Sequence, residues 1–325
     1  MTEPLLDIRD LTVAFGPEAR PLKVVEGVSF SVHAGEAVGL VGESGSGKSM
    51  TALSVLQLTP EAARLSGEIL FEGRDLLKVP RRRMPEIRGR EIGMVFQEPM
   101  SSLNPVMTIG DQIDEAIYLH ETLPADERRR RVLDLLRLVG MPDPEARLRA
   151  YPDQFSGGMR QRVMAAIAMA CNPRLLIADE PTTALDVTIQ AQVLAMMLDI
   201  RARLNSAILL ITHDLGVVAE VCERIVVMYA GRVVEDADVH TLFARPRHPY
   251  TQGLLRSVPT LTDTRDRLYQ IPGSVPPAGT ITEGCPFRAR CPRRLDICET
   301  RMPPLEPLSP THRAACWATV SEAVA

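Results

Sequence analysis

Residues 42–49, with the sequence GESGSGKS, have the residue types and spacing of a phosphate-binding loop. The apolar residues 37–41 before them predict a buried strand, and residues 50–56 after them predict a helix. Glycines allow backbone N–H groups to turn toward phosphate oxygens, and the helix N-terminus adds partial positive charge. Lys48 can pair with the β- and γ-phosphates of a nucleotide, and the Ser49 hydroxyl can ligate Mg²⁺. We therefore predict a nucleotide site formed by Gly42, Ser44, Gly45, Ser46, Gly47, Lys48 and Ser49.

Two adjacent carboxylates, Asp179 and Glu180, follow the apolar residues 175–178, which predict another buried strand. An acidic residue at the carboxyl end of such a strand can hold Mg²⁺ through water, which is the role we expect for Asp179. The next carboxylate, Glu180, can orient or deprotonate the attacking water. An acidic pair that ends a strand is weak evidence by itself. Together with the phosphate loop it indicates nucleotide hydrolysis.

A serine and two glycines, at 156–158, precede a segment with helical character. A serine hydroxyl and glycine amides at a helix N-terminus form an anion site. Residues 155–162, FSGGMRQR, resemble the LSGGQ signature of ATP-binding cassette (ABC) proteins and lie upstream of the acidic pair, as in that family. The resemblance covers residues 5–240. It implies that the signature faces the γ-phosphate bound by an opposite subunit, through Ser156, Gly157, Gly158 and Met159.

The remaining motifs of the family follow in its order. The resemblance implies that Gln97 is the glutamine that contacts Mg²⁺ and the attacking water, Asp186 the D-loop aspartate, and His213 the switch histidine. Phe15 stands where the family places an aromatic residue that stacks on adenine. Met159 replaces the usual Gln of the signature, and Phe15 replaces the commoner Tyr. Taken alone, His213 could equally be a buried core histidine.

Alternating strand and helix patterns predict an α/β fold. The resemblance implies that this fold is an ABC-type P-loop ATPase core. The strand signal disappears between about 101 and 162, which predicts a helical subdomain. Prolines become frequent after 245, so we expect a cassette over 1–244 and a proline- and cysteine-rich C-terminal extension over 245–325. The net charge of −4 argues against nucleic acid as a partner. The chain has neither an apolar run of membrane-spanning length nor an N-terminal signal-peptide pattern, so we expect a cytoplasmic protein.

Several stretches narrow the resemblance to the ATPase subunits of oligopeptide and dipeptide importers. They are residues 98–105 (EPMSSLNP), 248–251 (HPYT), 271–276 (IPGSVP) and 284–292 (GCPFRARCP). The resemblance implies Mg²⁺-dependent ATP hydrolysis in a dimer with a second, distinct ATPase subunit. It further implies two transmembrane permease subunits, an external peptide-binding protein, and a peripheral position on the cytoplasmic face of the inner (plasma) membrane.

Four of the six cysteines gather near the end of the chain, at Cys285, Cys291, Cys298 and Cys316. Their spacing matches neither a zinc ribbon nor the tight runs of ferredoxins, so spacing alone leaves a cluster, zinc and unligated thiols open. The resemblance implies a [4Fe–4S] cluster on these four residues, with zinc as the alternative, in the role of a structural clamp. Disulfides are not expected in a reducing compartment.

Other classes of function remain open at this point. Nickel importers are close relatives of the peptide importers. A non-transport ABC ATPase usually carries coiled coils or two cassettes in one chain, and this sequence has neither. A redox sensor that uses the tail cysteines would change its ATPase activity on cluster loss without binding a permease.

Overall fold

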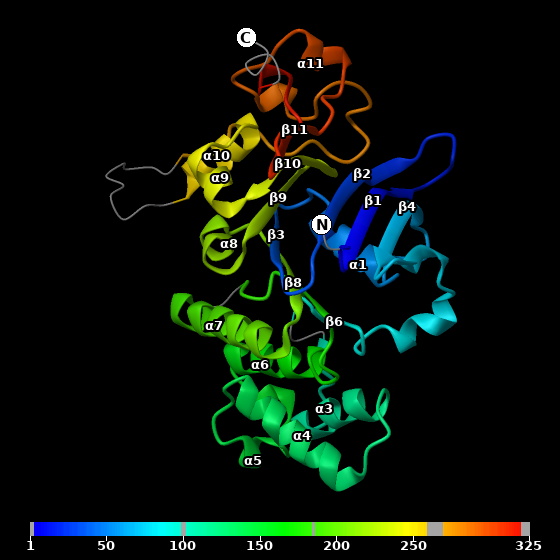
Figure 1. The fold of residues 1–325 in the computed structure, drawn as a ribbon, viewed down its shortest axis with the longest axis vertical. Helices are drawn as coiled ribbons and strands as arrows, with labels where there is room; N and C mark the ends of the chain where they lie inside the picture. The colour runs from blue at the N-terminus through cyan, green and yellow to red at the C-terminus, as the bar shows by residue number, and fades with distance from the viewer. Residues whose placement is uncertain (1–2, 99–101, 184–185, 259–268, 320–325) are drawn as a thin grey trace. The chain divides into compact units, whose positions relative to one another are not determined.

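The structure is a computed structural model and describes residues 3–98, 102–183, 186–258 and 269–319 (Figure 1). Ser101, where we expect the helical subdomain to begin, and the D-loop residues Ala184 and Leu185 lie outside these ranges. The chain forms two compact units. The first contains Val32–Ala37 and Lys78–Ile211 together with the first residues of the chain. The second contains Leu6–Ser31, Val38–Leu77 and Thr212–Ala325.

Parallel strands form the sheet of the first unit. β7 (Leu175–Asp179) lies between β6 (Ile92–Val95) and β8 (Ala207–Thr212). All five residues of β7 are buried, and every residue of β8 is buried as well. Strands buried on both faces read as continuous apolar runs, which is why the sequence predicts them well. The carboxyl end of β7 therefore delivers Asp179 to the edge of this sheet.

Helices make up the rest of the first unit. They are α3 (Ile109–Tyr118), α4 (Ala125–Leu138), α5 (Pro144–Arg147), α6 (Gly157–Ala168) and α7 (Val187–Leu204), with 3₁₀ turns at Arg81–Glu86 and Pro152–Gln154. Side-chain caps begin several of them: Thr108 accepts a hydrogen bond from the N–H of Asp111 at the start of α3. α6 ends at Ala168, so the helical run continues past the expected limit at 162.

An antiparallel sheet in the second unit has the strand order β2-β1-β4-β5. The strands are β1 (Leu6–Phe15), β2 (Leu22–Val32), β4 (Arg64–Phe71) and β5 (Arg74–Asp75). A bulge between Arg9 and Thr12, with Asp10 at a φ of 49°, shifts the β1 register. Because one extra residue reverses the inward face, Ile8 before the bulge and Leu11 after it are both buried.

Further paired strands of this unit include the strand that leads into the phosphate loop. β3 (Ala37–Val41) pairs in parallel with β9 (Arg224–Tyr229), and β9 forms a hairpin with β10 (Arg232–Asp238). α1 (Lys48–Val55) follows the loop and α8 (Leu215–Val221) follows β8, while a short 3₁₀ turn covers Leu76–Lys78. The expected order of strand, glycine loop and helix is present in the structure.

The C-terminal extension adds two strands beside β10. β12 (His312–Ala314) pairs with β10, and β11 (Glu306–Ser309) pairs with β12. The helices of the region are α9 (Val239–Ala244), α10 (Pro249–Ser257) and α11 (Ile297–Thr300), with a 3₁₀ turn at Arg288–Arg290. The compact unit therefore continues across residue 245, and the extension and the phosphate loop belong to the same unit. In the described part of the chain, no helix has the length and apolarity to cross a membrane.

Candidate functional site

The phosphate loop wraps tightly because all three of its glycines adopt conformations that other residues rarely take. Gly42 has a φ of 155°, and a Cβ atom there would lie 2.2 Å from the carbonyl oxygen of Met228. Gly47 caps α1 with a φ of 98°. Ser44 and Gly45 are exposed between them, and Ser49 is half-buried at the second position of α1. The loop thus presents backbone N–H groups in front of a helix N-terminus, which is the geometry of an anion site.

Lys48 lies across this loop. Its side chain is buried, and Nζ donates hydrogen bonds to the carbonyl oxygens of Gly42 at 2.7 Å and Glu43 at 3.1 Å. The Ser46 carbonyl accepts a hydrogen bond from the N–H of Gly231, in the turn of the β9–β10 hairpin. The lysine is therefore held at the mouth of the loop, where its charge can reach the phosphates of a nucleotide.

Two further predicted residues belong to the same unit. Phe15 is the last residue of β1 and is half-buried. His213 is exposed and follows Thr212, the last residue of β8. Asp214 caps α8 directly after it by accepting a hydrogen bond from the N–H of Gly216 at 2.8 Å. The exposure of His213 argues against the core-histidine alternative.

The acidic pair belongs to the first unit. Asp179 ends β7 and is buried, whereas Glu180 has a left-handed φ of 46° and its N–H bonds to the carbonyl of Ile211 at 2.8 Å. The Glu180 carboxylate accepts hydrogen bonds from Nε2 of Gln97 at 3.1 Å and from Oγ1 of Thr183 at 2.8 Å. The structure therefore brings Gln97 and Glu180 together across the ends of β6 and β7. Thr183 is a residue that motif spacing missed, and its position three residues after Glu180 is the only signal it gave.

The signature begins α6 with a side-chain cap. The Ser156 hydroxyl accepts a hydrogen bond from the N–H of Met159 at 3.4 Å, and Ser156 and Gly157 are exposed. Gly158 is buried, and a Cβ atom there would lie 2.4 Å from Cγ2 of Ile189 in α7. Asp186 caps α7 by accepting a hydrogen bond from the N–H of the same Ile189 at 2.9 Å. Ile189 thus contacts Gly158 through its side chain and Asp186 through its backbone N–H.

The four tail cysteines gather in one region of the extension. Three of them, Cys285, Cys298 and Cys316, are buried, and the N–H of Cys285 bonds to the Cys298 carbonyl at 2.8 Å. Burial, with a smaller contribution from the nearby thiols of Cys298, Cys291 and Cys316, raises the pKa of Cys285 to about 12. None of the six cysteines, all within the described ranges, forms a disulfide.

Four soft thiols in one region are the donor chemistry that zinc or an iron–sulfur cluster requires. Their arrangement is another matter. Across the residues that the structure describes, no three His, Cys, Asp or Glu side chains are placed to hold a single metal ion. In a tetrahedral zinc site the sulfurs lie close together, since each is only ~2.3 Å from the metal. The donor set therefore fits a thiolate-ligated group, but the observed positions do not form a zinc site.

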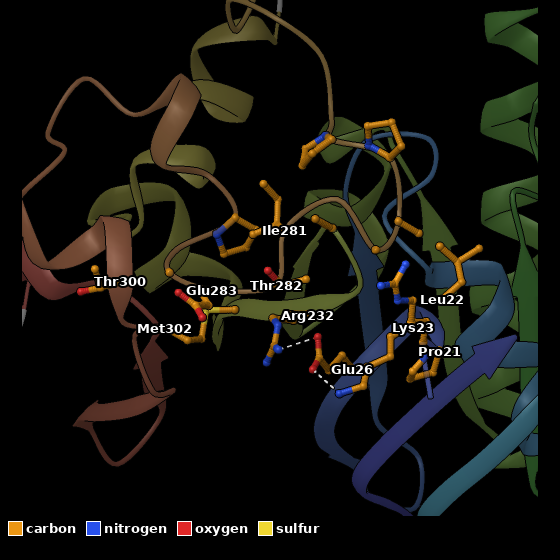
Figure 2. Close-up of a pocket in the computed structure, with 18 of the residues that line it drawn as sticks. Pro21, Leu22, Lys23, Glu26, Arg232, Ile281, Thr282, Glu283, Thr300 and Met302 are labelled. Atoms are coloured by element: carbon orange, nitrogen blue, oxygen red, sulfur yellow. Dashed lines mark hydrogen bonds and ion pairs between the residues drawn. The ribbon is translucent and has the colours of Figure 1, made fainter. Parts of the chain in front are cut away.

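A cavity of about 760 Å³ opens beside the β9–β10 hairpin in the second unit. Figure 2 shows Glu26 of β2 between Lys23 and Arg232, with Ile281, Thr282 and Glu283 of the extension nearby. Glu26 pairs with Lys23 at 2.7 Å and with Arg232 at 2.5 Å. Burial alone would raise the pKa of Glu26, but the hydrogen bonds and charges of these two cations outweigh it and lower the pKa. Lys23 and Arg232 are therefore already paired with a carboxylate in the wall of this cavity.

Comparison with known proteins identifies the family. Residues 25–183 match the model of the ABC transporter family, and residues 234–298 match that of the oligopeptide/dipeptide transporter C-terminal region. The dipeptide transport ATP-binding protein DppD of Escherichia coli is 48% identical over 98% of both chains. A "probable peptide ABC transporter ATP-binding protein" of Sinorhizobium fredii is 53% identical over 96% of this chain and 94% of its own length.

Solved structures agree with the fold. The dimeric ABC cassette MJ0796 bound to ADP and phosphate has a TM-score of 0.64 and 26% identity, over 72% of this chain and 98% of that chain. Cassette cbiO1 of Clostridium perfringens has a TM-score of 0.65 and 25% identity, over 75% and 92%. The chain belongs to the ABC transporter family, among the ATP-binding subunits of the oligopeptide/dipeptide group. It is an ABC-type ATPase with the mixed α/β cassette fold.

Proposed function

We propose that this chain is the ATP-hydrolysing motor subunit of an importer for dipeptides or oligopeptides. The observation that carries the proposal is the match along nearly the whole chain to peptide-transport ATP-binding proteins, including the C-terminal extension at 234–298. A match to the cassette alone would support ATP hydrolysis and leave the cargo open. The match to the extension favours peptides over the cargoes of other ABC importers.

We assign the ATP site by residue. The phosphate loop from Gly42 to Ser49 binds the phosphates, and Phe15 stacks on adenine. Ser49, Asp179 and Gln97 hold Mg²⁺, directly or through water. Glu180 acts as the general base toward water, and the hydrogen bonds from Gln97 and Thr183 support this role because they fix its carboxylate. His213 contacts the γ-phosphate; its exposure supports this assignment.

The motor works as a dimer in this proposal. The signature, Ser156 to Met159, contacts the ATP of the opposite subunit, and Asp186 lies in the D-loop at that interface. The exposed helix N-terminus at Ser156 and Gly157 supports the assignment, as does Val187, which is 84% exposed directly after Asp186. The opposite subunit is a distinct homologue.

We assign the contact with the permease to the first unit. Several large apolar side chains are exposed there after β6 and around α3: Phe96, Val106, Tyr118 and Leu119. Exposed apolar groups on one unit favour a protein partner. We assign this surface to two transmembrane permease subunits, which an external peptide-binding protein supplies. The chain then sits peripherally on the cytoplasmic face of the inner membrane.

We further propose that Cys285, Cys291, Cys298 and Cys316 hold a [4Fe–4S] cluster. The gathering of four thiols in one region of the extension supports the proposal. Bound there, the cluster would supply a cross-link between distant parts of the extension. The chain's own contribution is to bury the thiols and to fix Cys285 against Cys298 through the backbone.

Uptake measurements test the proposed cargo. We would delete the gene in its source strain and measure the uptake of a labelled dipeptide, a labelled tetrapeptide and Ni²⁺. Peptide uptake should be lost, return with the wild-type gene, and remain absent with a Lys48→Ala gene. Loss of Ni²⁺ uptake alone would show that the cargo is nickel and not a peptide. If all three rates stay unchanged, the transport proposal is wrong and a non-transport ATPase remains.

A further inference from the structure

Glu43, the second residue of the phosphate loop, is held by a residue of the C-terminal extension. Its carboxylate forms a two-pronged ion pair with Arg290, with Nη1 at 2.6 Å from Oε2 and Nη2 at 3.0 Å from Oε1. The Arg290 side chain is only 6% exposed. A bidentate pair of this kind fixes both distance and orientation, which a lysine could not do.

Arg290 is itself fixed by the extension. Its remaining N–H groups donate to the carbonyls of Pro272 at 2.8 Å and Ile271 at 3.2 Å and to the hydroxyl of Tyr229 at 3.3 Å. Burial disfavours the guanidinium charge, but the hydrogen bonds to Glu43 and Tyr229 outweigh burial and raise the pKa of Arg290. All five N–H donors of the side chain therefore have partners. The IPG segment at 271–273 therefore fixes the arginine that pairs with Glu43 of the phosphate loop.

The HPY segment of the extension reaches the same residue from another direction. The hydroxyl of Tyr250 accepts a hydrogen bond from the backbone N–H of Glu43 at 2.8 Å. Tyr250 is fully buried and packs against Tyr229, with ring centroids 4.6 Å apart, and against Phe287 at 5.5 Å. His248 caps this turn by accepting a hydrogen bond from the N–H of Tyr250 at 3.0 Å.

The contacts of Glu43 with Arg290 and with Tyr250 can affect ATP binding in two ways, through the backbone of the loop and through charge. The carbonyl of Glu43 accepts a hydrogen bond from Lys48, so the position of Glu43 helps to set the position of the phosphate-binding lysine. Glu43 directly precedes the exposed Ser44, and both belong to the loop that the proposed assignment places around the phosphates of ATP. An unpaired carboxylate at that place would repel a triphosphate. Arg290 neutralises it.

We propose that Arg290 and Tyr250 are positioning residues for the phosphate loop, so that the ATP affinity of the cassette depends on its C-terminal extension. The inference rests on the proposed assignment of residues 42–49 as the ATP site. In this proposal, three segments of the extension, around His248, Ile271 and Cys291, act together because all of them hold the contacts to Glu43 of the phosphate loop. The sequence separation between Glu43 and Arg290 is 247 residues, so spacing could not reveal the pair.

A charge-rescue experiment tests the pair. We would measure the ATP dissociation constant, KM and kcat of the full-length chain carrying Arg290→Gln, Glu43→Gln and both. Arg290→Gln should weaken ATP binding about tenfold by leaving the carboxylate unpaired, and should raise KM more than it lowers kcat. The double variant should recover to within about threefold of wild type, because the repelling charge is gone. A merely structural arginine would not be rescued by removing its partner's charge.

Further variants separate the possible failures. Arg290→Lys keeps the charge and loses the fork, so its ATP affinity should lie between those of wild type and Arg290→Gln. Tyr250→Phe should weaken ATP binding by about threefold through the lost hydrogen bond. Arg294→Gln is the matched control: Arg294 is 56% exposed and pairs with Glu299, and its ATP affinity should not change. Circular dichroism and thermal unfolding confirm that each variant is folded.

Three results would count against these claims, the first two against the positioning role and the third against the ATP site. If Arg290→Gln and Arg290→Lys bind ATP as the wild type does, the positioning role is wrong. The same holds if the double variant is as weak as Arg290→Gln alone. If Lys48→Ala binds ATP normally, the assignment of the loop as the ATP site is wrong. The positioning role of Arg290 and Tyr250 then has no basis either.

Discussion

The side-chain amide of Gln97 donates a hydrogen bond of 3.1 Å to Oε2 of Glu180, the same oxygen that accepts the hydroxyl hydrogen bond of Thr183 at 2.8 Å. These two hydrogen bonds fix the orientation of the carboxylate. The left-handed backbone at Glu180, with a φ of 46°, turns the side chain away from the line of β7. A general base needs this kind of support, because proton transfer depends on position before it depends on basicity.

Removal of the base should separate binding from turnover. Glu180→Gln keeps the size and hydrogen-bonding reach of the side chain but cannot accept a proton, so ATP binding should persist. Steady-state hydrolysis should fall by about 10²- to 10⁴-fold. A long-lived ATP-bound dimer should accumulate, measured by size-exclusion chromatography with ATP. Glu220→Gln, an exposed change on α8, is the control, and normal turnover in Glu180→Gln would remove this residue as the base.

The amide partner can be tested independently. Gln97→Ala removes one of the two donors to Glu180, so kcat should fall about tenfold while ATP affinity in the absence of Mg²⁺ stays near that of wild type. The comparison of binding with and without Mg²⁺ also reports on the proposed magnesium contact. If kcat does not change, the hydrogen bond between Gln97 and Glu180 has no part in turnover.

We expect the largest loss of ATP affinity when the lysine of the phosphate loop is replaced. Lys48→Ala removes the only buried ammonium group of the loop, and ATP affinity should drop by at least about 100-fold. Titration with a fluorescent ATP analogue measures it. Lys78→Ala, which changes an exposed lysine outside the loop, should bind as the wild type does. Equal affinities for the two variants would contradict the phosphate-site assignment.

Short motifs made the cassette predictable from sequence. Glycines, Lys48 and the strand before them are local features, and the backbone physics that selects them acts over a few residues. The same is true of the signature, where Ser156 caps α6 as expected. The relation of Gln97 to Glu180 follows from their places at the ends of strands β6 and β7, which pair in parallel. Thr183 belongs to no such motif and does not end a strand, so its contact with Glu180 could not be predicted in this way.

Long-range contacts in the extension could not be predicted in this way. Its prolines and fading periodicity suggested an appended segment, yet β12 adds to the sheet by pairing with β10, with Ala314 opposite Glu235. Short strands of three or four residues leave almost no periodic signal. Glu235 is fully buried and accepts hydrogen bonds from the N–H groups of Arg247 and His248. Such polar anchors depend on partners that come together only in the folded chain.

The tail cysteines give a prediction that measures metal directly. Replacing Cys285 and Cys291 by Ser should remove the iron and sulfide from anaerobically purified protein, together with the absorbance near ~400 nm of a thiolate-ligated cluster. Replacing Cys171 and Cys222, which lie outside this region, should leave the metal content unchanged. One zinc per chain in the wild type would make the site a zinc clamp, and equal metal content in both double variants would refute the site.

The contact between Gly158 and Ile189 predicts a specific steric effect in the signature. A Cβ atom at 158 would lie 2.4 Å from Cγ2 of Ile189, so Gly158→Ala should push α6 and α7 apart and lower the free energy of unfolding by about 1–3 kcal/mol. It should also shift Asp186, which caps α7 through the N–H of Ile189, and thereby reduce ATP-dependent dimerisation. Because Ile189→Ala removes the clashing Cγ2, the double variant should recover stability relative to Gly158→Ala. Thermal unfolding and size-exclusion chromatography with ATP measure the two effects. A Gly158→Ala chain as stable as wild type would show that α6 and α7 adjust freely, and the proposed link between signature and D-loop would then be lost.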